Sequence, residues 1–144
     1  MMRDLHSGLK TVLTLDPKLT TETRYGAPVD CRGFGAVEHI VCIGTAGDEL
    51  SEELSIACII EASDDGTSWT PVIAAHEVLG DPPDETGIFA LLDGDGQDMR
   101  DYRIGYAGPA RYTRIGVVLD GDHEEGTPIA ALALLGSAHL KPVN

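Results

Sequence analysis

The stretch "LSIACIIEASDDGTSWTPV", residues 54–72, decides the fold of this chain. Side chains along its first half, 54–63, alternate between two faces in the period-two pattern of an extended strand. The strand ends at Asp64 and Asp65, and Gly66 can adopt the positive φ that a tight hairpin turn needs. The stretch therefore predicts a β-hairpin.

The returning strand of this hairpin begins next to the single tryptophan of the chain. Trp69 and Pro71 fall on one side of it, and Thr70 and Val72 fall on the other. We expect the tryptophan to cap the end of the sheet. The two aspartates before it are then turn residues rather than a metal or catalytic site.

Outward from the hairpin, four more segments show strand-like alternation between turn-forming residues: 36–44, 102–108, 111–121 and 128–138. The last is rich in alanine and leucine, which favour a helix, but Pro128 and Gly136 bracket a strand-length piece. Segments 36–44 and 54–63 are apolar on each face. We therefore expect both in the middle of a sheet that is covered on both sides.

Loops rich in Gly, Pro, Asp and Ser separate these segments, and the chain contains 17 glycines and 8 prolines. This alternation of short strand-like segments and loops predicts an all-β fold, an antiparallel β-sandwich or a jelly-roll-like variant of it. Residues 1–18 are expected to form a short N-terminal arm or helical turn, and residues 19–144 a single β-sandwich domain. The N-terminus has no apolar secretory segment, and no apolar run is long enough to span a bilayer.

The charge balance is strongly acidic, with 24 Asp and Glu residues against 10 Lys and Arg residues and a net charge of −14. Nucleic-acid binding depends on basic side chains that neutralise phosphates, so this surface would repel a duplex. We expect neither nucleic acid nor a membrane as a partner. High acidity favours solubility at high local protein concentration.

No metal or disulfide framework is visible in the sequence. Cys31, Cys42 and Cys58 are odd in number and lack a CxxC spacing, which fits free thiols in a reducing compartment. The histidines lack the short spacings of a zinc site. "DGDGQD" at 93–98 places Asp93 and Asp95 like calcium ligands, but the later positions of the loop do not match. We expect no metal site and no cofactor.

The motifs of common catalytic sites are also missing. The sequence has no GxSxG elbow, and "CRGFG" at 31–35 lacks the third glycine and the helix of a dinucleotide fingerprint. Acidic residues concentrate between Glu61 and Asp101, but nothing in their spacing selects a catalytic pair. We predict that the chain is not an enzyme, and a hydrolase that uses the acidic loops remains the alternative.

"GPARYTRI" at 108–115 is the basic exception to the acidic surface. Strand alternation places Tyr112 and Arg114 on one face and Arg111 on the other. Together with Tyr106, these residues form the candidate subunit interface, because arginine and tyrosine are enriched where proteins meet. The alternative is a solvated strand whose arginines form intramolecular ion pairs.

These segments resemble a family of small structural proteins of tailed phages and gene transfer agents that are encoded among the head genes. The resemblance is carried by "MRDLHSGLK", "EASDDGTSWTPV", "YRIGYAGPARYTRIGVVL" and "ALALLGSAHLKPV". In its most specific part, relatives are expected to have the pattern IGYIG-x-x-RY-x-R, which matches Ile104, Gly105, Tyr106, Gly108, Arg111, Tyr112 and Arg114. The C-terminal end departs from the expected Gly-His-Pro, so the resemblance assigns no role to His139.

The resemblance implies a non-enzymatic component of the virion or gene-transfer-agent particle. It is expected on the outside of the head, as a head spike base or as a vertex or decoration protein, after assembly in the bacterial cytoplasm. Its expected partners are other copies of itself, in a homo-oligomer such as a pentamer, the capsid protein and a spike fibre. The N-terminal arm is the candidate anchor to the capsid or fibre, through Arg3, Asp4, Leu5, His6 and Leu9.

Two other functions stay open at this point. One is an adapter at the head–tail joint or in the tail, which would also work through its surfaces. The other is a carbohydrate-binding module for host attachment, because β-sandwiches often serve in this way. Aromatic residues are only 5% of the chain, which leaves few rings for stacking against sugars.

Overall fold

The computed structural model describes residues 3–139, and almost all regular structure in this range is antiparallel β. Two short 3-10 helices are present, η1 (His6–Gly8) and η2 (Ala75–Glu77). The strands are β1 (Lys10–Thr20), β2 (Arg24–Tyr25), β3 (Val29–Asp30), β4 (Phe34–Ile43), β5 (Ser55–Ser63), β6 (Thr70–Pro71), β7 (Val78–Leu79), β8 (Ile88–Leu92), β9 (Arg100–Tyr106), β10 (Tyr112–Asp120) and β11 (Thr127–Ala138).

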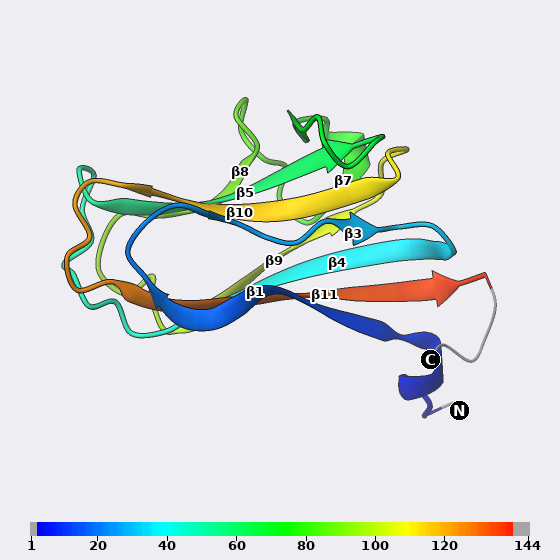
Figure 1. The fold of residues 1–144 in the computed structure, drawn as a ribbon, viewed down its shortest axis with the longest axis horizontal. Coiled ribbons are helices and arrows are strands. Elements are labelled where there is room, and N and C mark those ends of the chain that lie inside the picture. The colour runs from blue at the N-terminus through cyan, green and yellow to red at the C-terminus, as the bar shows by residue number, and fades with distance from the viewer. Residues whose placement is uncertain (1–2, 140–144) are drawn as a thin grey trace.

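The strands form two sheets that lie one above the other (Figure 1). Sheet A has the order β1-β11-β4-β9-β7, and sheet B is built around the neighbours β10 and β5. β2 and β3 pair with β10 on one side of sheet B, and β6 and β8 pair with β5 on the other. The predicted β-sandwich is confirmed, and residues 128–138 form a strand.

The core lies between the sheets because alternate side chains of the long strands point inward. Fully buried aliphatic side chains come from both layers, among them Val41, Ile104 and Ile129 from sheet A, and Ile56, Ile60 and Ile115 from sheet B. Each is at most 1% exposed. Burying such side chains contributes about 1.5–3 kcal/mol each, which makes the inter-sheet layer the main source of stability.

The predicted hairpin is present, with Glu61 paired to Pro71 across it. Gly66 has a φ of 80°. The Asp65 carboxylate closes the turn, because its Oδ1 accepts hydrogen bonds from the amides of Thr67 at 2.8 Å and Ser68 at 2.9 Å. These bonds hold the pKa of Asp65 far below its ordinary value. Asp65 is therefore a turn residue, as predicted.

The boundary predicted at residue 18 is wrong, because most of the expected arm is a strand. Lys10 to Thr20 form β1, the edge strand of sheet A, which pairs with β11. The register shifts between Leu13 and Leu15 and again before Lys18. These irregularities break the alternation that marks a strand in a sequence. What remains of the arm is η1 and its flanking residues, and residues 140–144 of the predicted domain lie outside the described range.

β1 is also fastened to sheet B, which closes one side of the sandwich. The amide of Gly26 donates to the carbonyl of Ile115 in β10, and the next amide, of Ala27, donates to the carbonyl of Thr14 in β1. The Arg24 guanidinium donates to the carbonyl of Asp16 at 2.7 Å and to that of Ile129 at 3.2 Å. The segment between β1 and β3 thus binds both layers.

Coverage of the outer faces differs from the prediction. β4 does lie between two strands of sheet A, but its outer face is open, with Glu38 and Ile40 half-buried and Cys42 exposed. β5 is more enclosed, and Ile59 on its outer face is 9% exposed. Within residues 3–139, no second layer covers β4, so its apolar outer residues face outward.

Candidate interaction surface

The outer face of sheet B carries a stack of planar side chains centred on Arg114. This residue pairs with Glu61 across β10 and β5, and its guanidinium donates to the Glu61 carboxylate at 2.9 Å. The guanidinium carbon lies 4.5 Å from the centre of the Tyr25 ring and 4.3 Å from that of Trp69. An arginine held between two rings and one carboxylate is fixed in position.

A glycine makes room for this stack. Gly116 pairs with Tyr25, and a Cβ at this glycine would lie 2.9 Å from the Tyr25 ring and 3.1 Å from Ile59. The ring therefore lies directly on the sheet, with 50% of Tyr25 still exposed. Trp69 lies just before β6, where the hairpin turns at the end of β5, and its ring also stacks on Arg114 of β10. We call the set Tyr25, Glu61, Trp69, Tyr112 and Arg114 the arginine face.

At the edge of the arginine face, Arg111 forms an ion pair with Asp30 of β3 at 3.0 Å. Its guanidinium lies 5.0 Å from the centre of the Tyr112 ring. The hydrogen bond from Arg111 holds the pKa of Asp30 below its ordinary value. Arg111 and Arg114 both form the intramolecular ion pairs of the alternative interpretation, so each positive charge on this face is matched by a carboxylate.

Tyr106 does not join the other three residues of the predicted interface. Its side chain points into the core and is 5% exposed, and its hydroxyl accepts a hydrogen bond from the Ala110 amide at 3.0 Å. Burial raises the pKa of this phenol. A Cβ at Gly108 would collide with the same ring. Tyr106 and Gly108 therefore shape the corner between β9 and β10 and do not form a contact surface.

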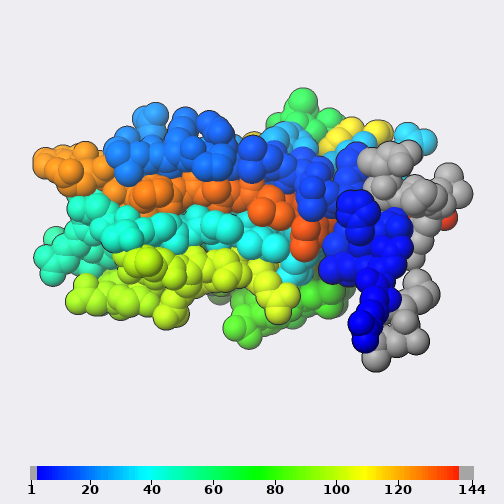
Figure 2. Space-filling model, turned by 90° about the horizontal axis from the view of Figure 1, so that it is seen from below, coloured from blue at the N-terminus to red at the C-terminus, as the bar shows by residue number. Residues whose placement is uncertain are grey.

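The outer face of sheet A has a different chemistry. Leu13, Leu132 and Ile40 are direct neighbours across β1, β11 and β4, and Leu134 lies beside them on β11. Figure 2 shows this face, on which β1, β11, β4 and β9 run side by side. Leu13 is 59% exposed and the other three are half-buried. We call this set the leucine face.

The leucine face continues toward the far end of β1. A shallow hollow of about 410 Å³ lies there, lined mainly by apolar side chains, including Leu19, Pro128 and Ala130. Leu19 is 58% exposed. Arg103 borders the opposite side of the leucine face and forms a long ion pair of 3.4 Å with Glu38. Glu38 is the cross-strand neighbour of Leu134, so this ion pair flanks the leucine face on the side of β9.

The candidate anchor residues precede β1 at one end of the sandwich (Figure 1). Arg3, Asp4, Leu5 and His6 are exposed, with Leu5 at 72%, while Leu9 is half-buried. The Asp4 carboxylate accepts a hydrogen bond from the Ser7 amide at 2.9 Å, which stabilises the turn of η1. Leu9 approaches Gly136 of β11, so the arm starts from a fixed point on the sheet.

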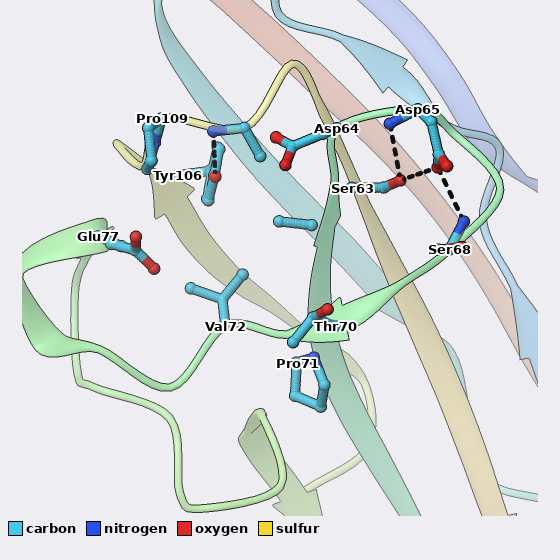
Figure 3. Close-up of a pocket in the computed structure, with 12 residues that line it drawn as sticks. Ser63, Asp64, Asp65, Ser68, Thr70, Pro71, Val72, Glu77, Tyr106 and Pro109 are labelled. Atoms are coloured by element: carbon cyan, nitrogen blue, oxygen red, sulfur yellow. Dashed lines mark hydrogen bonds between the residues drawn. The ribbon is translucent and has the colours of Figure 1, made fainter.

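A hollow of about 390 Å³ lies beneath the hairpin turn (Figure 3). Asp64, Asp65 and Glu77 are the acidic residues of its lining, which has no His, Cys, Lys or Arg. Figure 3 shows Asp65 turned toward Ser63 and Ser68 of the turn rather than into the hollow. The Asp65 carboxylate therefore stabilises the turn and does not face the hollow.

The remaining reactive side chains are dispersed. Within residues 3–139, no cluster of three His, Cys, Asp or Glu side chains is placed to hold a metal ion. All three cysteines are free, and burial raises the pKa of Cys58 to about 12 and that of Cys31 to about 11. In "DGDGQD", the side-chain oxygen of Gln97 accepts hydrogen bonds from the amides of Asp93 and Gly94, which closes a local turn. The described part of the chain also has no helix that is long and apolar enough to cross a membrane.

Comparison with known proteins finds similarity only among solved structures, since neither a family model nor a curated protein matches the chain. The SPBc2 prophage-derived protein YomS is 13% identical, with 88% of this chain and 93% of YomS covered and a TM-score of 0.45. A pectin-binding carbohydrate-binding module is 12% identical, with 84% and 72% covered and a TM-score of 0.35. A family two carbohydrate esterase from Cellvibrio japonicus is 11% identical, with 94% and 36% covered and a TM-score of 0.33.

The chain is thus similar to a prophage-derived protein at low identity. At these identities and TM-scores, the three likenesses assign no activity, ligand or partner to the chain. The arguments about function depend on its own residues.

Proposed function

We propose that the chain is a non-enzymatic structural component of a phage or gene-transfer-agent particle. It stands on the outside of the head, as a head spike base or as a vertex or decoration protein, and it acts through its two outer faces. The observation that carries the proposal is the leucine face, an aliphatic row across three strands that nothing in the described chain covers. Exposed apolar patches of this kind are typical of interaction surfaces.

The net charge of −14 supports the same role. An acidic chain is repelled by packaged DNA, so its place in a particle is on the outer side of the shell. The leucine face can dock on an apolar surface of the capsid protein, because the carboxylate beside it, that of Glu38, is paired with Arg103. The exposed residues of the arm, Arg3 to His6, lie at one end of the sandwich and can contact a fibre or the capsid.

The family resemblance in the sequence points to the same class of protein, and the structure explains the residues that carry it. Ile104 is a core residue, and Gly108 leaves room for the buried Tyr106 ring. Arg111 and Arg114 are fixed by ion pairs on β10. The segment that resembles the phage proteins therefore builds the β9–β10 corner and presents the arginine face. A tail or head–tail adapter would use the same surfaces.

The first test is the composition and structure of the particle itself. Purified particles from the source culture are separated into heads and tails, and the chain is identified by mass spectrometry and located by cryo-electron microscopy. The proposal expects the chain in the head fraction, on the outer surface. Complete particles that lack the chain would overturn the proposal, and density at the tail would assign it to the adapter role instead.

The contact surface is tested by replacing Leu13 with a charged residue. We expect Leu13→Asp to reduce incorporation into particles by about tenfold or more, because a carboxylate in a desolvated apolar contact is costly. Met99→Asp is the matched control, since Met99 is 72% exposed and lies outside both faces. Equal incorporation of Leu13→Asp and wild type would exclude the leucine face as the docking surface.

A further inference from the structure

We infer that the arginine face binds a second copy of this chain. The inference deepens the proposed function by naming the partner of one of the two faces. Its basis is the arrangement of charges and rings on the outer side of sheet B, where Arg114 lies between Tyr25 and Trp69 and pairs with Glu61.

The first argument is charge. Two copies of a chain with net charge −14 repel each other over most of their surfaces, so contact requires a face on which the carboxylates are already neutralised. The arginine face meets this condition, because Glu61 is paired with Arg114 and the adjacent Asp30 is paired with Arg111. Both signs lie side by side there, so the face is complementary to a copy of itself.

The second argument is the composition of the face. Tyr25 is 50% exposed, Trp69 and Tyr112 are half-buried, and Leu91 at the far end of the same outer face is 45% exposed. Tryptophan, tyrosine and arginine are the residues that contribute most binding energy at the centres of protein interfaces. Apolar area and matched charge therefore occur together on this side of the sandwich.

The third argument is rigidity. The Tyr25 ring is seated against Gly116, and the Arg114 guanidinium is held on three sides by Tyr25, Trp69 and Glu61. Side chains that are already fixed lose little conformational entropy on binding. The leucine face, which has aliphatic side chains and few charges, differs in chemistry and remains available for the capsid partner.

The test is sedimentation equilibrium of the purified chain at concentrations up to about 100 µM. We expect wild type to associate into a multiple of its 15.3 kDa mass. Tyr25→Ser is expected to raise the dissociation constant about tenfold or more, whereas Leu13→Ser on the leucine face leaves it unchanged. Raising the ionic strength from low to physiological values is expected to strengthen association, since it screens repulsion between the acidic copies.

Thermal melts of both variants check that they are folded, and Leu91→Ser replaces Tyr25→Ser if the latter does not fold. A wild type that stays monomeric overturns the inference, as does a folded Tyr25→Ser that associates like wild type. Association that weakens as salt is added also counts against a second acidic copy as the partner. A monomeric chain that is still found on particle heads would refute this inference and leave the proposed function intact.

Discussion

At the scale of single residues, the hairpin turn depends on the left-handed backbone of Gly66. Its φ is 80°, which side chains with a Cβ rarely adopt, and a Cβ there would contact the Tyr112 ring at 3.7 Å. We expect Gly66→Val to reduce the free energy of unfolding by about 1–2 kcal/mol, mainly through the backbone. Urea unfolding measures the change.

Gly94→Val is the control for this substitution. A Cβ at Gly94 meets no atom within 4 Å, and this glycine is not among those with positive φ. The free energy of unfolding of Gly94→Val is expected to stay within about 0.5 kcal/mol of that of wild type. Equal losses in the two variants would show that the turn at Gly66 is not specially constrained.

The turn could be predicted from the sequence because its determinants are local. Asp65 and Gly66 act on their immediate neighbours, and the spacing of such residues is visible in one dimension. The contacts of Trp69 could not be predicted in this way. Its ring is held by Arg114, a residue of a distant strand, and alternation gives the face of a side chain but not its partner.

At the scale of elements, Arg24 joins the irregular edge strand to its surroundings. Its guanidinium donates to the carbonyls of Asp16 and Ile129 and to the hydroxyl of Thr20 at 2.8 Å. We expect Arg24→Met to lower the free energy of unfolding by roughly 1–3 kcal/mol, because these acceptors lose a charged donor. Hydrogen exchange should be faster along the second half of β1.

Lys18→Met, on β1 itself, provides a comparison for the loss of a positive charge. Lys18 is exposed, so its replacement is expected to change stability little. If Arg24→Met behaved like Lys18→Met, the hydrogen bonds of Arg24 would contribute nothing to holding β1.

The long central strands were predictable because their apolar alternation is continuous, and residues 36–44, 54–63, 102–108, 111–121 and 128–138 all contain strands. β1 was missed because its register shifts twice and Pro17 interrupts the pattern. β2, β3, β6 and β7 have two residues each, too few to show a period. Their existence depends on the longer strands beside them.

At the scale of the whole molecule, one buried histidine links the stability of the sandwich to pH. His39 of sheet A is 0% exposed, and its Nε2 lies 3.2 Å from the Thr113 hydroxyl of sheet B. That hydroxyl donates to the Glu61 carbonyl at 3.1 Å, so it accepts the proton of a neutral His39. Burial lowers the pKa of His39 from 6.5 to about 4.

A lowered histidine pKa means that the unfolded chain binds the proton first as the pH falls. The stabilising contribution of neutral His39 is complete above pH 6.5 and is lost as the pH falls toward about 4. The loss is on the order of 3 kcal/mol at about 1.4 kcal/mol per pH unit. Urea unfolding at several pH values across this range gives the free energy of unfolding. This free energy should fall less steeply with decreasing pH in His39→Gln, because glutamine does not titrate. If the free energy of unfolding depended on pH equally in this variant and in wild type, His39 would not be the source of the pH dependence.

The sequence could also indicate that the chain acts through contacts with other proteins, but it could not show which residues form the contact faces. Composition and the "GPARYTRI" segment pointed to contacts between proteins, and two of its residues, Tyr112 and Arg114, do lie together on an outer face. The leucine face is formed by β1, β11 and β4, which are far apart in the chain. Only their pairing shows that Leu13, Leu132 and Ile40 are neighbours.

The fastening of β1 has a mechanical consequence for a protein that is held by its N-terminal arm. A pulling force on the arm would first unzip Lys10 to Leu13 from β11, since these pairs break one after another from the strand's end. The next residue, Thr14, is bonded to Ala27, and Asp16 is bonded to Arg24, so further peeling would also have to break the bonds that join β1 to the segment paired with sheet B. Under such a load, β1 would therefore peel first over Lys10 to Leu13 and would resist further peeling from Thr14 onward.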